Sequence, residues 1–119
     1  MRRHNESRMQ AACVRWFRYT HPELAHLLIA VPNGVATSET QGRILKEEGM
    51  VAGVADLLLL VPGNGGTLLA IEMKTETGRQ SDSQKHWQQV AEAHGIRYEV
   101  CRSFEQFETI INDYLHGRN

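Results

Sequence analysis

Two acidic residues and a lysine stand near the ends of two neighbouring apolar segments, where their side chains could act together. Glu72 and Lys74 lie two residues apart in the segment TLLAIEMK (67–74), so a strand would place both on one face. Asp56 begins the apolar segment DLLLLV (56–61). A carboxylate beside an ammonium is either an exposed ion pair of little value for stability or the start of an active site. The local pattern leaves both interpretations open.

The turn between these segments determines which residues face each other. The sequence PGNGG (62–66) is typical of a tight turn, so the two segments should form an antiparallel hairpin. A turn centred on Asn64 places Asp56 directly opposite Glu72. Facing carboxylates repel each other unless a cation lies between them, and Mg²⁺ is often held by one or two carboxylates together with substrate phosphate and water. A shift of one residue would make the pair diagonal, and two solvated carboxylates at strand ends remain the alternative.

Three further polar side chains could complete such a site. Lys74 could orient an attacking water or neutralise developing negative charge. Glu6 lies at the edge of the apolar stripe of the first predicted helix, and Gln84 heads the stripe of the helix predicted at 82–94. The alternatives are local: Gln84 could cap its helix together with Ser81, and Glu6 could be an acid that favours the helix dipole. Gln80 falls in the connection before the helix, and we expect it to lie outside the site.

Other common catalytic and metal-binding patterns are absent from the sequence. The six histidines show no His-Glu-x-x-His spacing, and two cysteines are too few for a structural zinc site. The PGNGG turn lacks the Lys-Ser/Thr continuation of a phosphate-binding loop. Cys13 and Cys101 lie in apolar patterns, which predicts reduced core residues and suits an intracellular, cytoplasmic protein.

Charge is nearly balanced overall but uneven along the chain. The net charge of −1 gives no general indication of a polyanionic partner. However, the first 20 residues carry five arginines and a single acid, Glu6. Such a basic segment can contact phosphates, or it can be a solvated helix face. No apolar run has the length of a membrane span, and no signal-peptide pattern is visible, so we expect no membrane partner.

Hydrophobic periodicity predicts eight elements in the order helix, strand, helix, strand, strand, helix, strand, helix. In chain order they are a helix from an Asn5 cap to Thr20, strand 27–31, helix 38–48, strands 56–61 and 67–74, helix 82–94, strand 96–101 and a helix from a Ser103 cap to Gly117. A right-handed crossover makes the last two strands parallel, whereas the hairpin is antiparallel. This predicts one α/β domain over 1–119, with a small mixed β-sheet flanked by helices on both faces.

The candidate residues and their surroundings resemble a known nuclease family. Asp56 followed by Glu72-x-Lys74 on the next strand looks like the PD-(D/E)xK nuclease signature. Four segments that cover most of the chain resemble the VRR-NUC domain, the virus-type replication-repair branch of that superfamily: 32–34, 45–60, 70–95 and 99–115. The family often has Pro before the Asp, where this chain has Ala55. The resemblance implies a restriction-endonuclease-like core.

The resemblance also implies an activity and a set of roles. It implies hydrolysis of phosphodiester bonds in DNA with Mg²⁺ or Mn²⁺. Asp56, Glu72 and the Met73 backbone carbonyl would ligate the metal. Lys74 would serve the attacking water, and Gln84 and Glu6 would complete the catalytic set. From charge and position, the candidate DNA contacts are the five N-terminal arginines (Arg2, Arg3, Arg8, Arg15 and Arg18) and the segment TETGRQ (75–80), which contains Arg79.

Substrate and assembly follow from the same resemblance. Stand-alone members of the family are similar to Holliday-junction resolvases that act as homodimers, whereas versions fused to larger repair proteins are flap nucleases. A two-fold dimer presents two sites, which suits the two symmetric cuts that a four-way junction needs. We therefore expect a homodimer that cuts branched DNA. The rival interpretations are a monomeric flap or nicking nuclease and a catalytically silent DNA-binding module.

Overall fold

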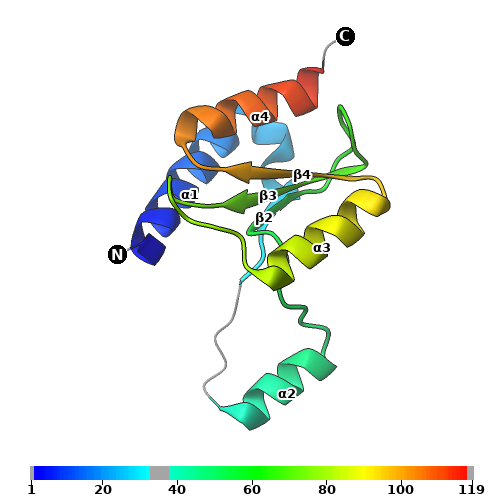
Figure 1. Ribbon diagram of the computed structural model, residues 1–119. Coiled ribbons are helices and arrows are strands. Elements are labelled where there is room, and N and C mark those ends of the chain that lie inside the picture. Colours follow the sequence, from blue (N-terminus) through cyan, green and yellow to red (C-terminus); the bar gives the residue numbers. More distant parts are fainter. Residues whose placement is uncertain (1, 33–37, 118–119) are drawn as a thin grey trace.

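The computed structural model describes residues 2–32 and 38–117, with side chains from residue 5 onward in the first segment. Figure 1 shows nine elements in this part of the chain. They are α1 (Arg2–Thr20), the 3₁₀ helix η1 (Pro22–Leu27), β1 (Leu28–Ala30), α2 (Glu39–Glu47), β2 (Leu57–Leu59), β3 (Leu68–Met73), α3 (Asp82–Ala93), β4 (Ile96–Cys101) and α4 (Phe104–His116).

The four strands form one mixed sheet in the order β1-β2-β3-β4. β1 and β3 both pair antiparallel with β2, and β4 runs parallel to β3. Leu57 pairs with Ile71 in the hairpin, so the predicted register is correct and the position before β2, Asp56, faces Glu72. The mixed sheet and the α/β class predicted from the sequence are confirmed.

Helices cover the two faces of the sheet unequally. α1 and α4 pack on one face, where Phe17 and Phe107 join Ile71 and Met73 in the larger apolar cluster. α3 covers the other face, where Trp87 packs against a small cluster around Ala70 and Tyr98. Because side chains alternate along β3, the odd-numbered positions enter the large cluster and the even-numbered positions, including Glu72, face the side of α3.

Several element boundaries differ from the sequence prediction. The Asn5 cap is wrong because α1 already begins at Arg2 and the intervening residues include no helix breaker. The six residues before β1 form η1, which begins at Pro22 and was not anticipated. β1 and β2 are shorter than predicted, although hydrogen bonds from Val31 N–H to the Asp56 carbonyl and from Leu60 N–H to the Leu27 carbonyl continue their pairing. Asn33 and Gly34 of the predicted turn lie outside the described residues.

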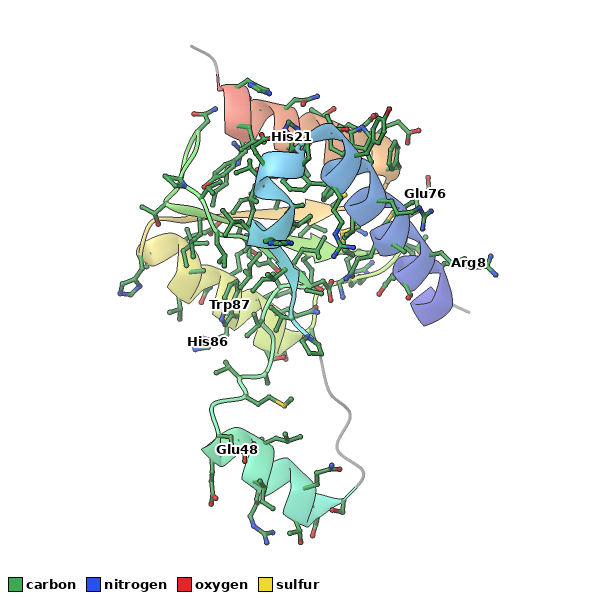
Figure 2. All side chains as sticks on the ribbon, turned by 180° about the vertical axis from the view of Figure 1, so that it is seen from behind. Arg8, His21, Glu48, Glu76, His86 and Trp87 are labelled. Carbon is green, nitrogen blue, oxygen red and sulfur yellow. The ribbon has the colours of Figure 1, made fainter. Side chains whose placement is uncertain are left out.

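α2 forms as predicted but covers neither face of the sheet. Its Ser38 cap accepts a hydrogen bond from Gln41 N–H at 3.1 Å, and no side chain of the helix is buried. Figures 1 and 2 both show α2 standing apart from the sheet and its other helices. Ile44 on α2 and Val51 just beyond it are 47% and 56% exposed. This part of the molecule therefore presents apolar side chains to solvent.

Among the residues that the structure describes, no helix combines the length and the apolar character that crossing a bilayer requires.

Candidate active site

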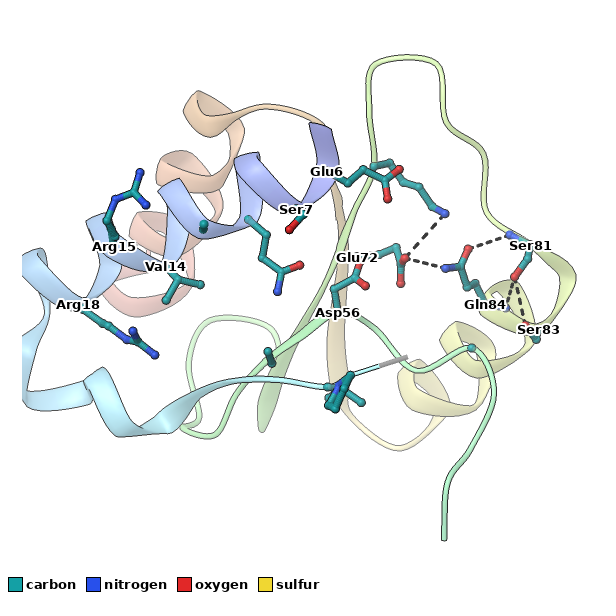
Figure 3. Close-up of a pocket in the computed structure, with 17 residues that line it drawn as sticks. Glu6, Ser7, Val14, Arg15, Arg18, Asp56, Glu72, Ser81, Ser83 and Gln84 are labelled. Carbon is teal, nitrogen blue, oxygen red and sulfur yellow. Dashed lines mark hydrogen bonds and ion pairs between the residues drawn. The ribbon is translucent and has the colours of Figure 1, made fainter. Parts of the chain in front are cut away.

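Asp56 and Glu72 lie close together at one end of the hairpin (Figure 3), and Lys74 lines the same cavity. Lys74 follows β3 directly, and its Nζ lies 3.8 Å from Glu72 Oε2. Asp56 Oδ2 accepts the Met73 N–H at 2.8 Å, which fixes this carboxylate beside the end of β3. Glu72 is only 1% exposed. The Glu72–Lys74 pair is therefore largely buried, and the interpretation as an exposed surface ion pair is wrong.

A glycine brings the segment before Asp56 close to α3. Gly53 has φ +87°, and a Cβ added there would lie 2.3 Å from the Ser83 carbonyl oxygen. Only a residue without a side chain allows this approach, and Gly also adopts this φ without strain. Ala55, two residues on, is fully buried. Together these small residues let the chain enter β2 against the start of α3, with the Asp56 side chain turned into the site.

Gln84 has both of the roles that the sequence left as alternatives. Its Oε1 accepts the Ser81 N–H at 2.8 Å while its own N–H donates to Ser81 Oγ at 3.2 Å, so the two residues form a capping box. At the same time Gln84 Nε2 donates to Glu72 Oε2 at 2.7 Å. The helix cap therefore fixes the orientation of an amide that holds the central carboxylate.

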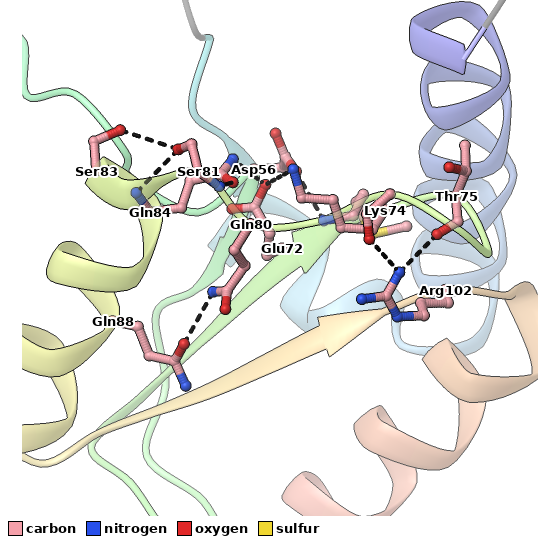
Figure 4. A network of polar contacts seen from close by, with 12 residues as sticks. Asp56, Glu72, Lys74, Thr75, Gln80, Ser81, Ser83, Gln84, Gln88 and Arg102 are labelled. Atoms are coloured by element: carbon pink, nitrogen blue, oxygen red, sulfur yellow. Dashed lines mark hydrogen bonds and ion pairs between the residues drawn. The ribbon is translucent and has the colours of Figure 1, made fainter.

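A second set of hydrogen bonds holds the other oxygen of Glu72. The Tyr98 hydroxyl donates to Glu72 Oε1 at 3.4 Å. Gln80 Nε2 donates to the Tyr98 oxygen at 3.1 Å and to Gln88 Oε1 at 2.9 Å, as part of the network in Figure 4. Gln80, which we expected to lie outside the site, is thus connected to it, because the loop before α3 folds back over β4. Tyr98 was missed, although its register in a parallel pair with β3 places it on the Glu72 face.

Burial and a neighbouring carboxylate disfavour the charged form of Glu72. Burial, followed by the charge of Asp56, raises the pKa of Glu72 to about 8. The Lys74 ammonium and the Tyr98 hydroxyl act in the opposite direction but are outweighed. Burial and the charge of Glu72 also raise the pKa of Tyr98, so its hydroxyl remains a donor. Either a proton or a cation bound between Asp56 and Glu72 would relieve this repulsion.

All five predicted catalytic residues line one cavity of about 1020 Å³. The cavity is open to solvent and lies between α1, the end of β1 and the start of α3 (Figure 3). Asp56, Glu72, Lys74 and Gln84 form one end, and Glu6 reaches the cavity from α1. Within the described residues, no three His, Cys, Asp or Glu side chains are close enough together to hold a metal ion. Glu6 therefore shares the cavity without completing a cluster of three acids.

The predicted DNA contacts divide into those that line this cavity and those that do not. Arg8 is exposed on α1 and extends away from the molecule in Figure 2. Arg79 is exposed in the loop between β3 and α3. The side chains of Arg2 and Arg3 lie outside the described residues. The arginines that do line the cavity are Arg15 and Arg18, further along α1.

Arg102 holds the loop that follows Lys74. Its guanidinium donates to the carbonyl oxygens of Thr75 at 2.8 Å and Gly78 at 2.6 Å (Figure 4). Arg102 comes directly after β4, so one side chain ties the loop to the neighbouring strand. The loop connects β3 to α3 and is fixed at both ends, by Arg102 and by the Ser81 cap.

Comparisons with known proteins identify the fold and the family of this chain. No curated protein matches the chain. A solved structure described as a "VRR_NUC domain protein" is similar with a TM-score of 0.81 and 18% sequence identity, over 96% of this chain and 90% of that chain. At this identity the likeness shows the fold. The family model of the VRR-NUC domain matches residues 4–105, a range that contains all five predicted catalytic residues. The chain therefore belongs to the VRR-NUC family and carries a nuclease-type domain.

Proposed function

We propose that this chain is a metal-dependent endonuclease that hydrolyses phosphodiester bonds in branched DNA. The observation that carries the proposal is the pair of facing carboxylates, Asp56 and Glu72, held in one solvent-open cavity beside a lysine. Repulsion between these facing carboxylates lowers the stability of the fold, and arrangements with such a cost are typical of functional sites. A phosphodiester is an anion, and a cation between the carboxylates would allow it to approach.

The oxygen atoms at this position suit Mg²⁺ or Mn²⁺. Two carboxylates and a backbone carbonyl are hard oxygen donors, which these ions prefer. Met73 N–H reaches Asp56, and the N–H and C=O of one strand residue point to the same edge, so the Met73 carbonyl also faces Asp56. Asp56, Glu72 and this carbonyl would hold the ion. Bound there, the cation would supply positive charge beside the transferring phosphate and activate a water.

The remaining side chains would orient the attacking water and hold the Glu72 carboxylate in place. The Lys74 ammonium would direct the attacking water and stabilise charge on the phosphate oxygens, because it stands beside Glu72 on the open side of the strand. Gln84 and Tyr98 each hold one oxygen of Glu72, so the carboxylate cannot rotate away. Glu6 would act from α1, across the cavity, on the water or on the ion's hydration shell.

We further propose that the active form is a homodimer that cuts four-way junctions. A two-fold dimer places two identical sites on a substrate that has approximate two-fold symmetry. The region of α2 supports this proposal, because Ile44 on the helix and Met50 and Val51 just after it expose apolar surface, and no side chain of the helix is buried in the part of the chain that the structure describes. A second copy of the chain would bury this surface.

Two other functions give different results in one assay. A monomeric flap or nicking nuclease would cut a 5′ flap or a nicked duplex better than a junction, and a silent module would bind DNA without cutting. The intact set of Asp56, Glu72 and Lys74 favours catalysis over silence. The assay incubates a four-way junction, a 5′ flap and a linear duplex with the protein in Mg²⁺, in Mn²⁺ and in EDTA.

The expected result is cleavage of the junction in either metal and none in EDTA. Asp56→Asn should abolish cleavage while DNA binding persists, because the change removes charge but little volume. Glu76→Gln is the matched control, since Glu76 is an exposed acid in the loop after Lys74. Cleavage in EDTA at the rate seen with Mg²⁺, or an Asp56→Asn variant as fast as Glu76→Gln, would refute the proposal.

A further inference from the structure

The cavity continues beyond the carboxylates along α1. Besides Glu6, its α1 wall contains Gln10, Val14, Arg15 and Arg18, and its opposite wall is the end of β1 and the residues after it. Figure 3 shows Glu6 at one end of α1, beside Asp56 and Glu72, and Arg15 and Arg18 toward the other end. The cavity therefore has an acidic end, where the reaction is proposed, and a basic end.

The side chains of this wall share one face of the helix. Ser7, Ala11, Val14 and Arg18 follow each other at intervals of four, three and four residues, which is the spacing of neighbours on a helix surface. With a rise of about 1.5 Å per residue, Arg15 and Arg18 stand about 13 and 18 Å along the axis from Glu6. A strand of duplex DNA carries a phosphate about every 3.4 Å of axis. The two arginines are therefore about four to five phosphates from the acidic end.

Arg15 and Arg18 differ from the arginines that stabilise the fold. Arg97 donates to the Glu99 and Asp113 carboxylates, and Arg102 donates to loop carbonyls. Arg15 and Arg18 are exposed, and neither forms a hydrogen bond or an ion pair with any residue in the described part of the chain. Their guanidinium groups remain available for an external anion, and a guanidinium binds phosphate well because it offers several donors in one plane.

We propose that Arg15 and Arg18 form a phosphate-binding track for the strand that is cut. The strand would run between α1 and the end of β1, with its scissile phosphate at the carboxylates and phosphates about four to five nucleotides away at the arginines. This inference rests on the proposed nuclease function. It predicts that a substrate needs an arm long enough to reach the arginines on one side of the cut.

The test measures DNA binding in an Asp56→Asn background, so that the substrate stays intact. The double variant Arg15→Ala/Arg18→Ala should reduce the slope of log affinity against log salt concentration by about 2, since each phosphate contact contributes about 0.9. Junctions with arms of decreasing length supply the second readout. Protein that retains both arginines should bind a junction more weakly once its arm is shorter than about five nucleotides. The affinity of the double variant should not depend on arm length.

Arg8→Ala is the comparison that keeps the test specific. It removes one positive charge from the same helix, where the double variant removes two, and Arg8 does not line the cavity, so the dependence on arm length should persist. If the double variant keeps the salt dependence and the arm-length dependence of DNA binding seen in the parent, the track proposal is wrong. Cleavage by the parent protein distinguishes the nuclease proposal from the track proposal. If the parent cuts DNA and the double variant binds DNA as the parent does, only the track proposal is refuted. A parent that binds through the arginines but never cuts refutes the nuclease.

Discussion

At the scale of single residues, the site depends on how Glu72 is held. Three groups converge on its carboxylate: Gln84 on one oxygen, Tyr98 on the other, and Lys74 at 3.8 Å. In an otherwise dry position, each contact fixes the direction of the charge. The distinction between groups that touch the substrate and groups that only orient Glu72 can be tested by substitution.

Tyr98→Phe should separate positioning from catalysis. Loss of the hydroxyl removes one hydrogen bond from Glu72 and leaves the ring packed against Trp87. We expect the Mg²⁺ concentration for half-maximal cleavage to rise about tenfold, while the rate at saturating Mg²⁺ changes little. Tyr114→Phe, which removes a buried hydroxyl that bonds backbone carbonyls elsewhere, is the control. Equal metal dependence in the two variants would assign Tyr98 a purely structural role.

Without metal, the stability of the protein should fall as pH rises. The pKa of Glu72 is about 8 in the folded chain, above its ordinary value of 4.5, so the folded state binds this proton more tightly than the unfolded state. The contribution of Glu72 is most favourable below pH 4.5 and is lost as pH rises towards 8. Over this interval the free energy of unfolding should decrease by up to about 1.4 kcal/mol per pH unit.

Glu72→Gln isolates that contribution. Denaturant unfolding in EDTA at several pH values should give a flatter profile for Glu72→Gln, and greater stability than the parent at pH 8, because the variant buries no charge. Subtracting the two profiles removes the contributions of the histidines. Parallel profiles for parent and variant would mean that Glu72 is not shifted in the folded chain.

At the scale of elements, the site depends on how closely β2, β3 and α3 approach each other. Gly53→Ala should damage this approach, since the added Cβ would lie 2.3 Å from the Ser83 carbonyl oxygen and the residue has φ +87°. We expect a loss of about 1–3 kcal/mol in stability together with a large loss of cleavage. Gly49→Ala is a matched control, because Gly49 has φ +112° with nothing within 4 Å of the added Cβ.

The comparison separates backbone strain from the geometry of the site. Both glycine variants should unfold at lower temperature in a thermal melt. Only Gly53→Ala should lose cleavage when assayed well below its melting temperature. A fully active Gly53→Ala protein would mean that the contact with α3 does not position Asp56.

α2 supplies a second test at this scale. Ile44→Glu introduces a charge into the exposed apolar surface and should convert a dimer into a monomer, as measured by light scattering at micromolar concentration. Val90→Glu alters an exposed apolar residue on α3 and should leave the dimer intact. A parent protein that is already monomeric at these concentrations would contradict the homodimer and favour the flap or nicking nuclease.

The parts of the site that follow from local sequence patterns, such as turns and helix caps, could be predicted from the sequence. The hairpin turn determined the register of Asp56 and Glu72, and the Ser-x-x-Gln pattern identified the start of α3. Tyr98 and Gln80 depend on the register of a parallel pair joined by a long crossover, which alternation alone cannot supply. The position of Arg15 and Arg18 depends on the rotation of α1 against the sheet, which is decided by packing of Cys13 and Phe17.

At the scale of the whole molecule, the fold brings together segments that are far apart in sequence. α1, the end of β1, the hairpin and the start of α3 meet at one end of the sheet, and the cavity lies between them. Two apolar clusters on opposite faces of the sheet hold β3, so Glu72 is fixed between packed layers. The proposed nuclease function depends on the chemistry of the side chains that these elements bring into the cavity.

Single-turnover cleavage of a four-way junction in Mg²⁺ by Lys74→Ala tests that account most directly. Removing one group that stabilises charge in the transition state should slow cleavage by about 10²–10³-fold. The fold and DNA binding should persist, as checked by circular dichroism and a binding assay. Lys85→Ala, which removes an exposed lysine next to Gln84, should keep the parent rate. A Lys74→Ala protein that cuts as fast as Lys85→Ala would contradict the assignment of the active site.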